Sequence, residues 1–127
     1  MKFLGIDYGS KRVGVALSDE DGRIAFPLAT LPNNSNLIKE IEKICKERGV
    51  GAIVLGESLD YKGKPNQIQS AIANCKLKIE KFTGLAVVYQ QEFLTSKQAE
   101  RSTTKASADA SAAALILQGY LDKGNRI

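Results

Sequence analysis

The sequence feature that most constrains the fold is a pair of apolar runs near the N-terminus, separated by a glycine turn. Residues 3–6 form the first run, which ends at Asp7, and residues 13–17 alternate between larger and smaller side chains in the second. Such alternation is typical of β-strands, so the two runs predict an antiparallel pair. The turn between them lies at residues 8–11, where Gly9 is expected to adopt a positive φ angle.

A third strand is predicted directly after this pair. The Asp21-Gly22 dipeptide is a hairpin-turn signal, and residues 24–31 follow it. Pro27 lies within this segment. Because proline has no backbone N–H to donate, the third strand is expected at an edge of the sheet.

Helical spacing replaces strand alternation after residue 32. Apolar residues recur every three or four positions from Leu37 to Cys45, and Gly49 is expected to end this helix. The apolar segments 50–55 and 85–89 are predicted to be further strands, of which the first should be buried and parallel to its neighbour. Between them lies a second helix whose buried face is predicted to carry Ile68, Ala71, Ile72, Cys75, Ile79 and Phe82.

The order of these elements defines the fold class. Three consecutive strands, two helix–strand units and a final helix predict an α/β fold with a five-stranded mixed sheet, three strands antiparallel and then two parallel, flanked by helices. The length suits one domain over residues 1–127. The first strand should be central, and ligands are expected at the C-terminal ends of the strands.

Composition excludes several classes of chemistry. The chain has no histidine, which excludes histidine-based catalysis, Ser-His-Asp triads and most zinc sites. Cys45 and Cys75 fall on apolar helix faces and are predicted to be small core residues in a reducing cytosol. With no signal-like N-terminus and no apolar run of membrane-spanning length, a cytoplasmic protein without a membrane partner is expected. The net charge of +4 is compatible with a nucleic-acid partner and equally with an ordinary soluble protein.

Three carboxylates from distant segments are predicted to meet at one edge of the sheet. Asp7 and Glu92 each end a strand, and Asp109 lies on the buried stripe of a final helix expected from residue 108 to about residue 121, with Ser107 as its N-cap. A buried carboxylate is costly unless a positive group meets it. Each acid also has a simpler explanation: a turn cap for Asp7, a solvated loop residue for Glu92, and a favourable helix-dipole position for Asp109.

A cluster of three acids indicates a divalent metal site. Carboxylate oxygens favour Mg²⁺ or Mn²⁺ over Zn²⁺, and a pair of such ions can clamp the hydrolysis of a phosphodiester bond. Basic and hydroxyl side chains near the acids are candidate phosphate contacts, although each is individually as easily explained as a solvated surface group. These candidates are Ser10, Lys11, Arg12, Lys62, Lys64, Lys97, Arg101 and Lys105.

Four segments resemble one known family. Residues 5–19 read G-I-D-Y-G-S-K-R-V-G-V-A-L-S-D and resemble the opening motif of the YqgF family, a group of RuvC-like Holliday junction resolvases. Residues 54–63, Glu92 with Leu94-Thr95-Ser96, and Asp109 with the helix after it resemble further motifs of the family. The resemblance covers nearly the whole chain.

The resemblance implies a ribonuclease H-like fold and a Mg²⁺-dependent nuclease. Members have been assigned to maturation of the 5′ end of precursor 16S rRNA and to the resolution of Holliday junctions, so the partner would be structured RNA or branched DNA. Asp7, Glu92 and Asp109 would be the catalytic acids and metal ligands, and Thr95 would join the nucleic-acid contacts. The sequence chooses neither between these substrates nor between a monomer and a weak dimer.

The sequence also departs from the family pattern, which leaves a second hypothesis open. The family's Asp-Glu-Arg reads Gln91-Glu92-Phe93 here, so one acid and one base are replaced. If Gln91 replaces an essential ligand, the chain would be a nucleic-acid-binding module with weak or no catalysis. A third hypothesis, a phosphate-binding turn of the sugar-kinase type, requires two domains that close around ATP, for which the chain is short.

Overall fold

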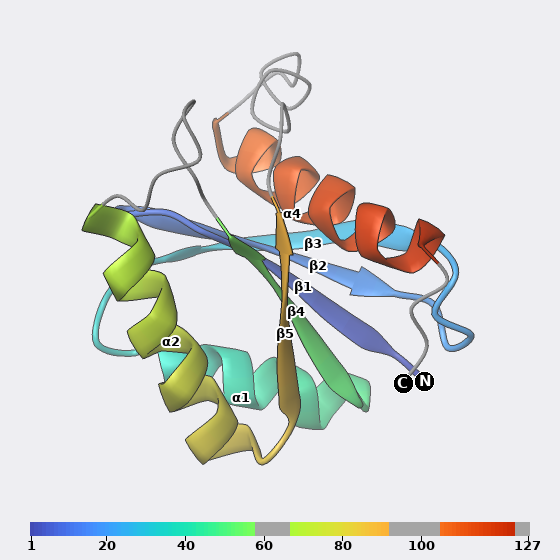
Figure 1. Ribbon diagram of the computed structural model, residues 1–127, viewed down its shortest axis with the longest axis horizontal. Coiled ribbons are helices and arrows are strands. Elements are labelled where there is room, and N and C mark those ends of the chain that lie inside the picture. The colour runs from blue at the N-terminus through green and yellow to red at the C-terminus, as the bar shows by residue number, and fades with distance from the viewer. Residues whose placement is uncertain (58–66, 92–104, 124–127) are drawn as a thin grey trace.

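A five-stranded sheet with helices on both faces forms the body of the protein, as the computed structural model in Figure 1 shows. The structure describes residues 1–57, 67–91 and 105–123. The strand order is β3-β2-β1-β4-β5. The elements in chain order are β1 (Phe3–Tyr8), β2 (Arg12–Ser18), β3 (Ala25–Pro32), α1 (Leu37–Arg48), β4 (Ala52–Glu57), α2 (Gln67–Thr83), β5 (Ala86–Gln91) and α4 (Lys105–Asp122).

The first three strands form the antiparallel meander predicted from their alternation. β1 pairs with β2 so that Asp7 lies opposite Gly14, and β2 pairs in turn with β3. The register of the second pair shifts between Val15 and Ala16. β3 is an edge strand, as Pro27 predicted, and Gly22 has a positive φ of 69° in the hairpin turn before it.

The parallel half of the sheet places β1 at its centre. β4 runs parallel to β1 with Leu55 beside Ile6, and β5 runs parallel to β4 with Gln90 beside Gly56. Both strands begin one or two residues later than predicted and extend two residues further. The mixed-sheet fold class is therefore confirmed, and the C-terminal ends of three parallel strands share one edge of the sheet.

Large aliphatic side chains fill the face covered by α1 and α2. The buried set includes Leu4, Ile6, Val13, Val15, Ile41, Ile53, Leu55, Ile72 and Ile79. Cys45 and Cys75 lie in the same layer with 5% of their surface exposed, which confirms their predicted core positions. Burial raises the pKa of each thiol to about 11.

Smaller residues line the opposite face, which α4 covers. A Cβ added to Gly5 would lie 2.7 Å from Cβ of Leu117 and 3.1 Å from the carbonyl oxygen of Ala113. The alanine-rich helix α4 therefore approaches the sheet closely at Gly5. At the far end of this layer the rings of Phe3 and Tyr120 pack with their centroids 5.9 Å apart.

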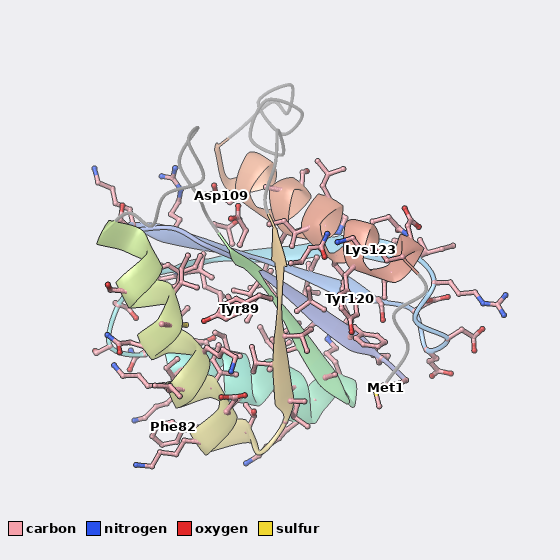
Figure 2. The ribbon with its side chains drawn as sticks, in the orientation of Figure 1. Met1, Phe82, Tyr89, Asp109, Tyr120 and Lys123 are labelled. Carbon is pink, nitrogen blue, oxygen red and sulfur yellow. The ribbon has the colours of Figure 1, made fainter. Side chains whose placement is uncertain are left out.

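Three local predictions are wrong. Phe82 is 56% exposed at the end of α2 instead of buried, because the turn at Gly84 ends the helix where its face leaves the sheet (Figure 2). Gly9 is not among the glycines with positive φ; a side chain there would meet the carbonyl oxygen of Arg12 at 2.5 Å. Ser107 is not the N-cap of the last helix, which already begins at Lys105.

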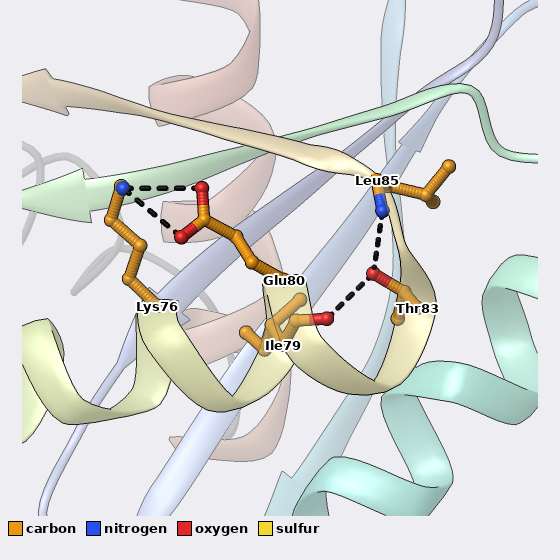
Figure 3. Close-up of polar contacts among 5 residues, drawn as sticks. All are labelled: Lys76, Ile79, Glu80, Thr83 and Leu85. Atoms are coloured by element: carbon orange, nitrogen blue, oxygen red, sulfur yellow. Dashed lines mark hydrogen bonds and ion pairs between the residues drawn. The ribbon is translucent and has the colours of Figure 1, made fainter.

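The turn from α2 into β5 is held by side-chain hydrogen bonds (Figure 3). The hydroxyl of Thr83 donates to the carbonyl oxygen of Ile79 at 2.6 Å and accepts from the backbone N–H of Leu85 at 3.1 Å. One turn earlier, Lys76 pairs with Glu80 at 3.2 Å. The two Thr83 hydrogen bonds tie the last turn of α2 to the residue that precedes β5.

Candidate functional site

Asp7 lies at the C-terminal end of the central strand, on the side of the sheet covered by α4. Its neighbours Ile6 and Tyr8 pack into the layer under α1 and α2, and successive residues of a strand point to opposite faces. Asp7 therefore shares the α4 face with Gly5 and with its register partner Gly14. The predicted position of this acid at the edge of the sheet is the observed one.

Asp109 reaches the same place from the other end of the chain. A Cβ on Gly14 would come within 1.9 Å of the carbonyl oxygen of Asp109, so the helix backbone rests directly on β2 at this point. Figure 2 shows Asp109 near the start of α4, over the sheet, while Lys123 lies at the helix's other end. Asp7 and Asp109 thus flank the same glycine. The signal for this contact in the sequence is Gly14, although strand alternation alone predicts only a small residue there.

Arg12 supplies the positive charge that the partly buried carboxylate of Asp109 requires. Its Nε donates to Oδ2 of Asp109 at 2.7 Å. The Arg12 side chain is 43% exposed and that of Asp109 28%. Arg12 precedes Gly14 by two residues on β2 and so lies on the same face of the sheet. In the sequence this residue was only a candidate phosphate contact.

The remaining predicted residues lie around this pair or outside the described chain. Ser10 and Lys11 are exposed in the β1–β2 turn, and Lys105 begins α4. Gln90, which was not a predicted site residue, pairs with Gly56 near the C-terminal end of β5 and is 9% exposed, but its side chain accepts a hydrogen bond at 3.1 Å from Lys123, at the opposite end of α4 from Asp109. Glu92, Lys62, Lys64, Thr95, Lys97 and Arg101 lie outside the described residues.

The donor chemistry of this edge suits a hard divalent cation. Asp7 and Asp109 offer carboxylate oxygens on one face of the sheet, and the Arg12 guanidinium shows that a cation is accommodated at Asp109. Within residues 1–57, 67–91 and 105–123 no group of three His, Cys, Asp or Glu side chains gathers as a complete metal site. A third protein ligand would have to come from another segment, and Glu92 is the predicted one.

Two surface cavities lie on the other face of the sheet. One of about 240 Å³ is lined by residues that include Glu42, Cys45 and Thr83, and one of about 260 Å³ by residues that include Asn74 and Lys78. The described residues that line these two cavities do not include Asp7 or Asp109. No described helix has the length and apolar character needed to cross a membrane.

Comparison with protein families and sequences gives a consistent result. A family model named RuvX and described as "Holliday junction resolvase" matches residues 1–123. A protein of Chloroflexus aggregans named "Putative pre-16S rRNA nuclease" is 35% identical, over 94% of this chain and 92% of its own. A protein of the same name from Nitratidesulfovibrio vulgaris is 34% identical, over 96% and 94% respectively.

Solved structures share the fold at low sequence identity. RuvC of Thermus thermophilus, in complex with a Holliday junction substrate, superposes with a TM-score of 0.66 and 16% identity, covering 98% of this chain and 96% of RuvC. The Fowlpox virus resolvase, in complex with Holliday junction DNA, gives a TM-score of 0.63 at 10% identity, covering 99% and 100%. These likenesses establish a RuvC-like ribonuclease H fold.

Proposed function

The chain belongs to the RuvX family, the YqgF family that its motifs resemble, and on that premise we propose that it is a metal-dependent endonuclease acting on structured nucleic acid. Maturation of the 5′ end of precursor 16S rRNA is the leading activity, and resolution of Holliday junctions is the alternative. The observation that carries the proposal is the meeting of Asp7 and Asp109 at Gly14, which joins acids from opposite ends of the chain at the edge where such sheets bind ligands.

In this proposal Asp7 and Asp109 hold Mg²⁺ or Mn²⁺ through their carboxylate oxygens, with Glu92 as the third ligand. A bound ion of this kind activates water and stabilises the charge that develops at a scissile phosphate. The rest of the described edge is shaped to hold the two carboxylates: Gly14 lets α4 approach, and Arg12 orients Asp109 through the 2.7 Å contact. A fixed arrangement of this kind lowers the reorganisation required during reaction.

The nucleic acid would approach over the β1–β2 turn. Ser10 and Lys11 are exposed there, next to Asp7 in the chain, and the net charge of +4 favours a phosphate backbone. We propose the same role for the basic and hydroxyl residues that lie outside the described chain or whose side chains are not described: Lys62, Lys64, Thr95, Lys97, Arg101 and Lys105. Cytoplasmic action is the corresponding expectation, because the two buried free thiols suit a reducing compartment.

One feature favours a second function, a nucleic-acid-binding module without turnover. Gln91 ends β5 beside Glu57, where the family motif has an acid. If that acid were an essential metal ligand, the chain would still bind nucleic acid in a salt-sensitive manner but would not cut it. Metal-dependent cleavage by the purified protein would exclude this alternative.

The proposed activity is tested by cleavage of a precursor 16S rRNA fragment and of a four-way DNA junction, with Mg²⁺, with Mn²⁺ and with a chelator. Asp7→Asn and Asp109→Asn are each expected to slow cleavage at least about 100-fold, because each removes a charged ligand oxygen. Asp21→Asn is the matched control, since Asp21 is an exposed acid in the β2–β3 turn. Wild-type rates in both site variants would contradict the assignment.

A further inference from the structure

The ion pair between Arg12 and Asp109 joins two groups that the proposed function uses separately. Nε of Arg12 donates to Oδ2 of Asp109 at 2.7 Å, and this oxygen belongs to a carboxylate proposed to bind a metal ion. A guanidinium held against this oxygen and a divalent cation on the same carboxylate repel each other strongly at such short range. The two cations are therefore expected to compete for Asp109.

The surroundings explain why a cation is needed before any metal arrives. Asp7 and Asp109 lie on the same face of the sheet and both adjoin Gly14, so their negative charges repel. Asp109 is also only 28% exposed, which limits the ability of water to screen it. Arg12 offsets this repulsion and holds the carboxylate side chain in one orientation.

The same surroundings allow Arg12 to leave. Its side chain is 43% exposed, so the released guanidinium returns to water at little cost, and ion pairs of this exposure are weak. Arg12 begins β2 directly after the exposed Ser10-Lys11 turn, across which nucleic acid is proposed to lie. A guanidinium freed at this point is well suited to a phosphate, which it can bind through two parallel hydrogen bonds.

We propose that Arg12 is an exchangeable counter-cation for Asp109. It positions the carboxylate in the metal-free protein, gives it up when a divalent cation binds, and then binds a phosphate of the nucleic acid beside the cleavage site. This role rests on the proposed function, because it assumes that Asp109 is a metal ligand. It makes metal binding and nucleic-acid binding mutually favourable. Metal binding frees Arg12 for a phosphate, and a phosphate bound to Arg12 frees Asp109 for the metal.

The test measures metal affinity without any substrate. Mn²⁺ is titrated calorimetrically into wild-type protein, Arg12→Gln, Arg12→Lys and Lys11→Gln, the last being a matched loss of charge at the neighbouring exposed position. Arg12→Gln is expected to bind Mn²⁺ at least about 5-fold more tightly than wild type, at the lower end of typical couplings between sites. Lys11→Gln and Arg12→Lys should stay close to wild type, and circular dichroism confirms that each variant is folded.

A second readout concerns the substrate side of the exchange. In cleavage assays Arg12→Gln is expected to need less Mn²⁺ but several-fold more nucleic acid for half-maximal rate. An Mn²⁺ affinity in Arg12→Gln equal to or weaker than wild type would overturn the role of Arg12 even if cleavage is normal. Loss of Mn²⁺ binding in Asp109→Asn supports the assumption that Asp109 is a metal ligand. Wild-type Mn²⁺ affinity in that variant would contradict both this inference and the metal assignment.

Discussion

The two faces of the sheet are built from different side chains and serve different purposes. Under α1 and α2 the strands present large branched residues such as Ile6, Val15 and Ile53. Under α4 they present Phe3 and Val54 together with Gly5, Gly14 and alanines, and at the two glycines the helix comes close to the strands. Burial of a large aliphatic side chain contributes roughly 1.5–3 kcal/mol, whereas glycine and alanine contribute much less. The first face therefore supplies the larger share of the stability, and the second also places α4 close to the strands.

Directional contacts add to the apolar packing on the α4 face. The Gln118 side chain accepts from the backbone N–H of Ala25 and donates to the carbonyl oxygen of Arg23, both at 2.9 Å. Together with the Phe3–Tyr120 ring contact and the Arg12–Asp109 pair, these bonds fix the helix along its length. These contacts hold the backbone and the carboxylate of Asp109 in place. A small shift of α4 should therefore affect function more than stability.

The largest expected effect on stability comes from the α1 and α2 face. Ile53→Ala removes a fully buried side chain from β4 and should lower the free energy of unfolding by about 2–5 kcal/mol. Urea unfolding measures this loss. Below the unfolding transition, cleavage per folded molecule should match wild type. A selective loss of activity would contradict the separation of stability on this face from function on the α4 face.

The second variant is expected to lose activity while it remains folded. Gly14→Ala places a methyl group against the carbonyl oxygen of Asp109, only 1.9 Å from its ideal position, so α4 must move. Overpacking of this kind costs about 1–3 kcal/mol. Because the displaced backbone carries Asp109, cleavage should fall at least about 10-fold in protein that is still folded.

Gly51→Ala is the matched control for Gly14→Ala. There the atoms nearest to the added methyl belong to the flexible side chain of Met1, the first at 2.7 Å, and this side chain can move aside. Stability should stay within about 0.5 kcal/mol of wild type and activity should be unchanged. Equal activity losses in the two alanine variants would show that contact with α4 is not the cause.

The effect confined to the narrowest range of conditions, and absent at neutral pH, concerns the two thiols of the α1 and α2 face. Their pKa is raised from the ordinary 9.0 to about 11, so the unfolded chain loses these protons at lower pH than the folded one. The contribution to stability is therefore complete below about pH 9 and is lost as the pH rises toward 11. Urea unfolding across this range should show a steeper decline for wild type than for the Cys45→Ala/Cys75→Ala variant. Identical pH profiles would contradict the burial of the thiols.

Strand patterns made most of the fold predictable. Alternation at Val13–Leu17, the turn signal at Gly22 and the edge signal of Pro27 are local, and each was confirmed. Phe82 and the start of α4 were predicted wrongly because periodicity does not reveal where a helix leaves the sheet or how far it extends.

The site was predictable only in part, for a related reason. Asp7 and Asp109 could be assigned to one edge because strand ends and the helix stripe are sequence patterns. The contact at Gly14 and the Arg12 partner depend on the distance between a helix and a strand about a hundred residues apart, which sequence spacing does not contain. The roles of Glu92 and of the lysines around it remain predictions.

The distance along the chain between Asp7 and Asp109 has a consequence for biosynthesis. Translation at roughly 5–20 residues per second separates the two acids by about 5 to 20 s. During that interval a growing chain can already pair β1, β2 and β3 but has no second carboxylate to complete the edge. If the protein cuts ribosomal precursors through these two acids, as proposed, its nascent chain cannot cut the RNA around it until α4 docks.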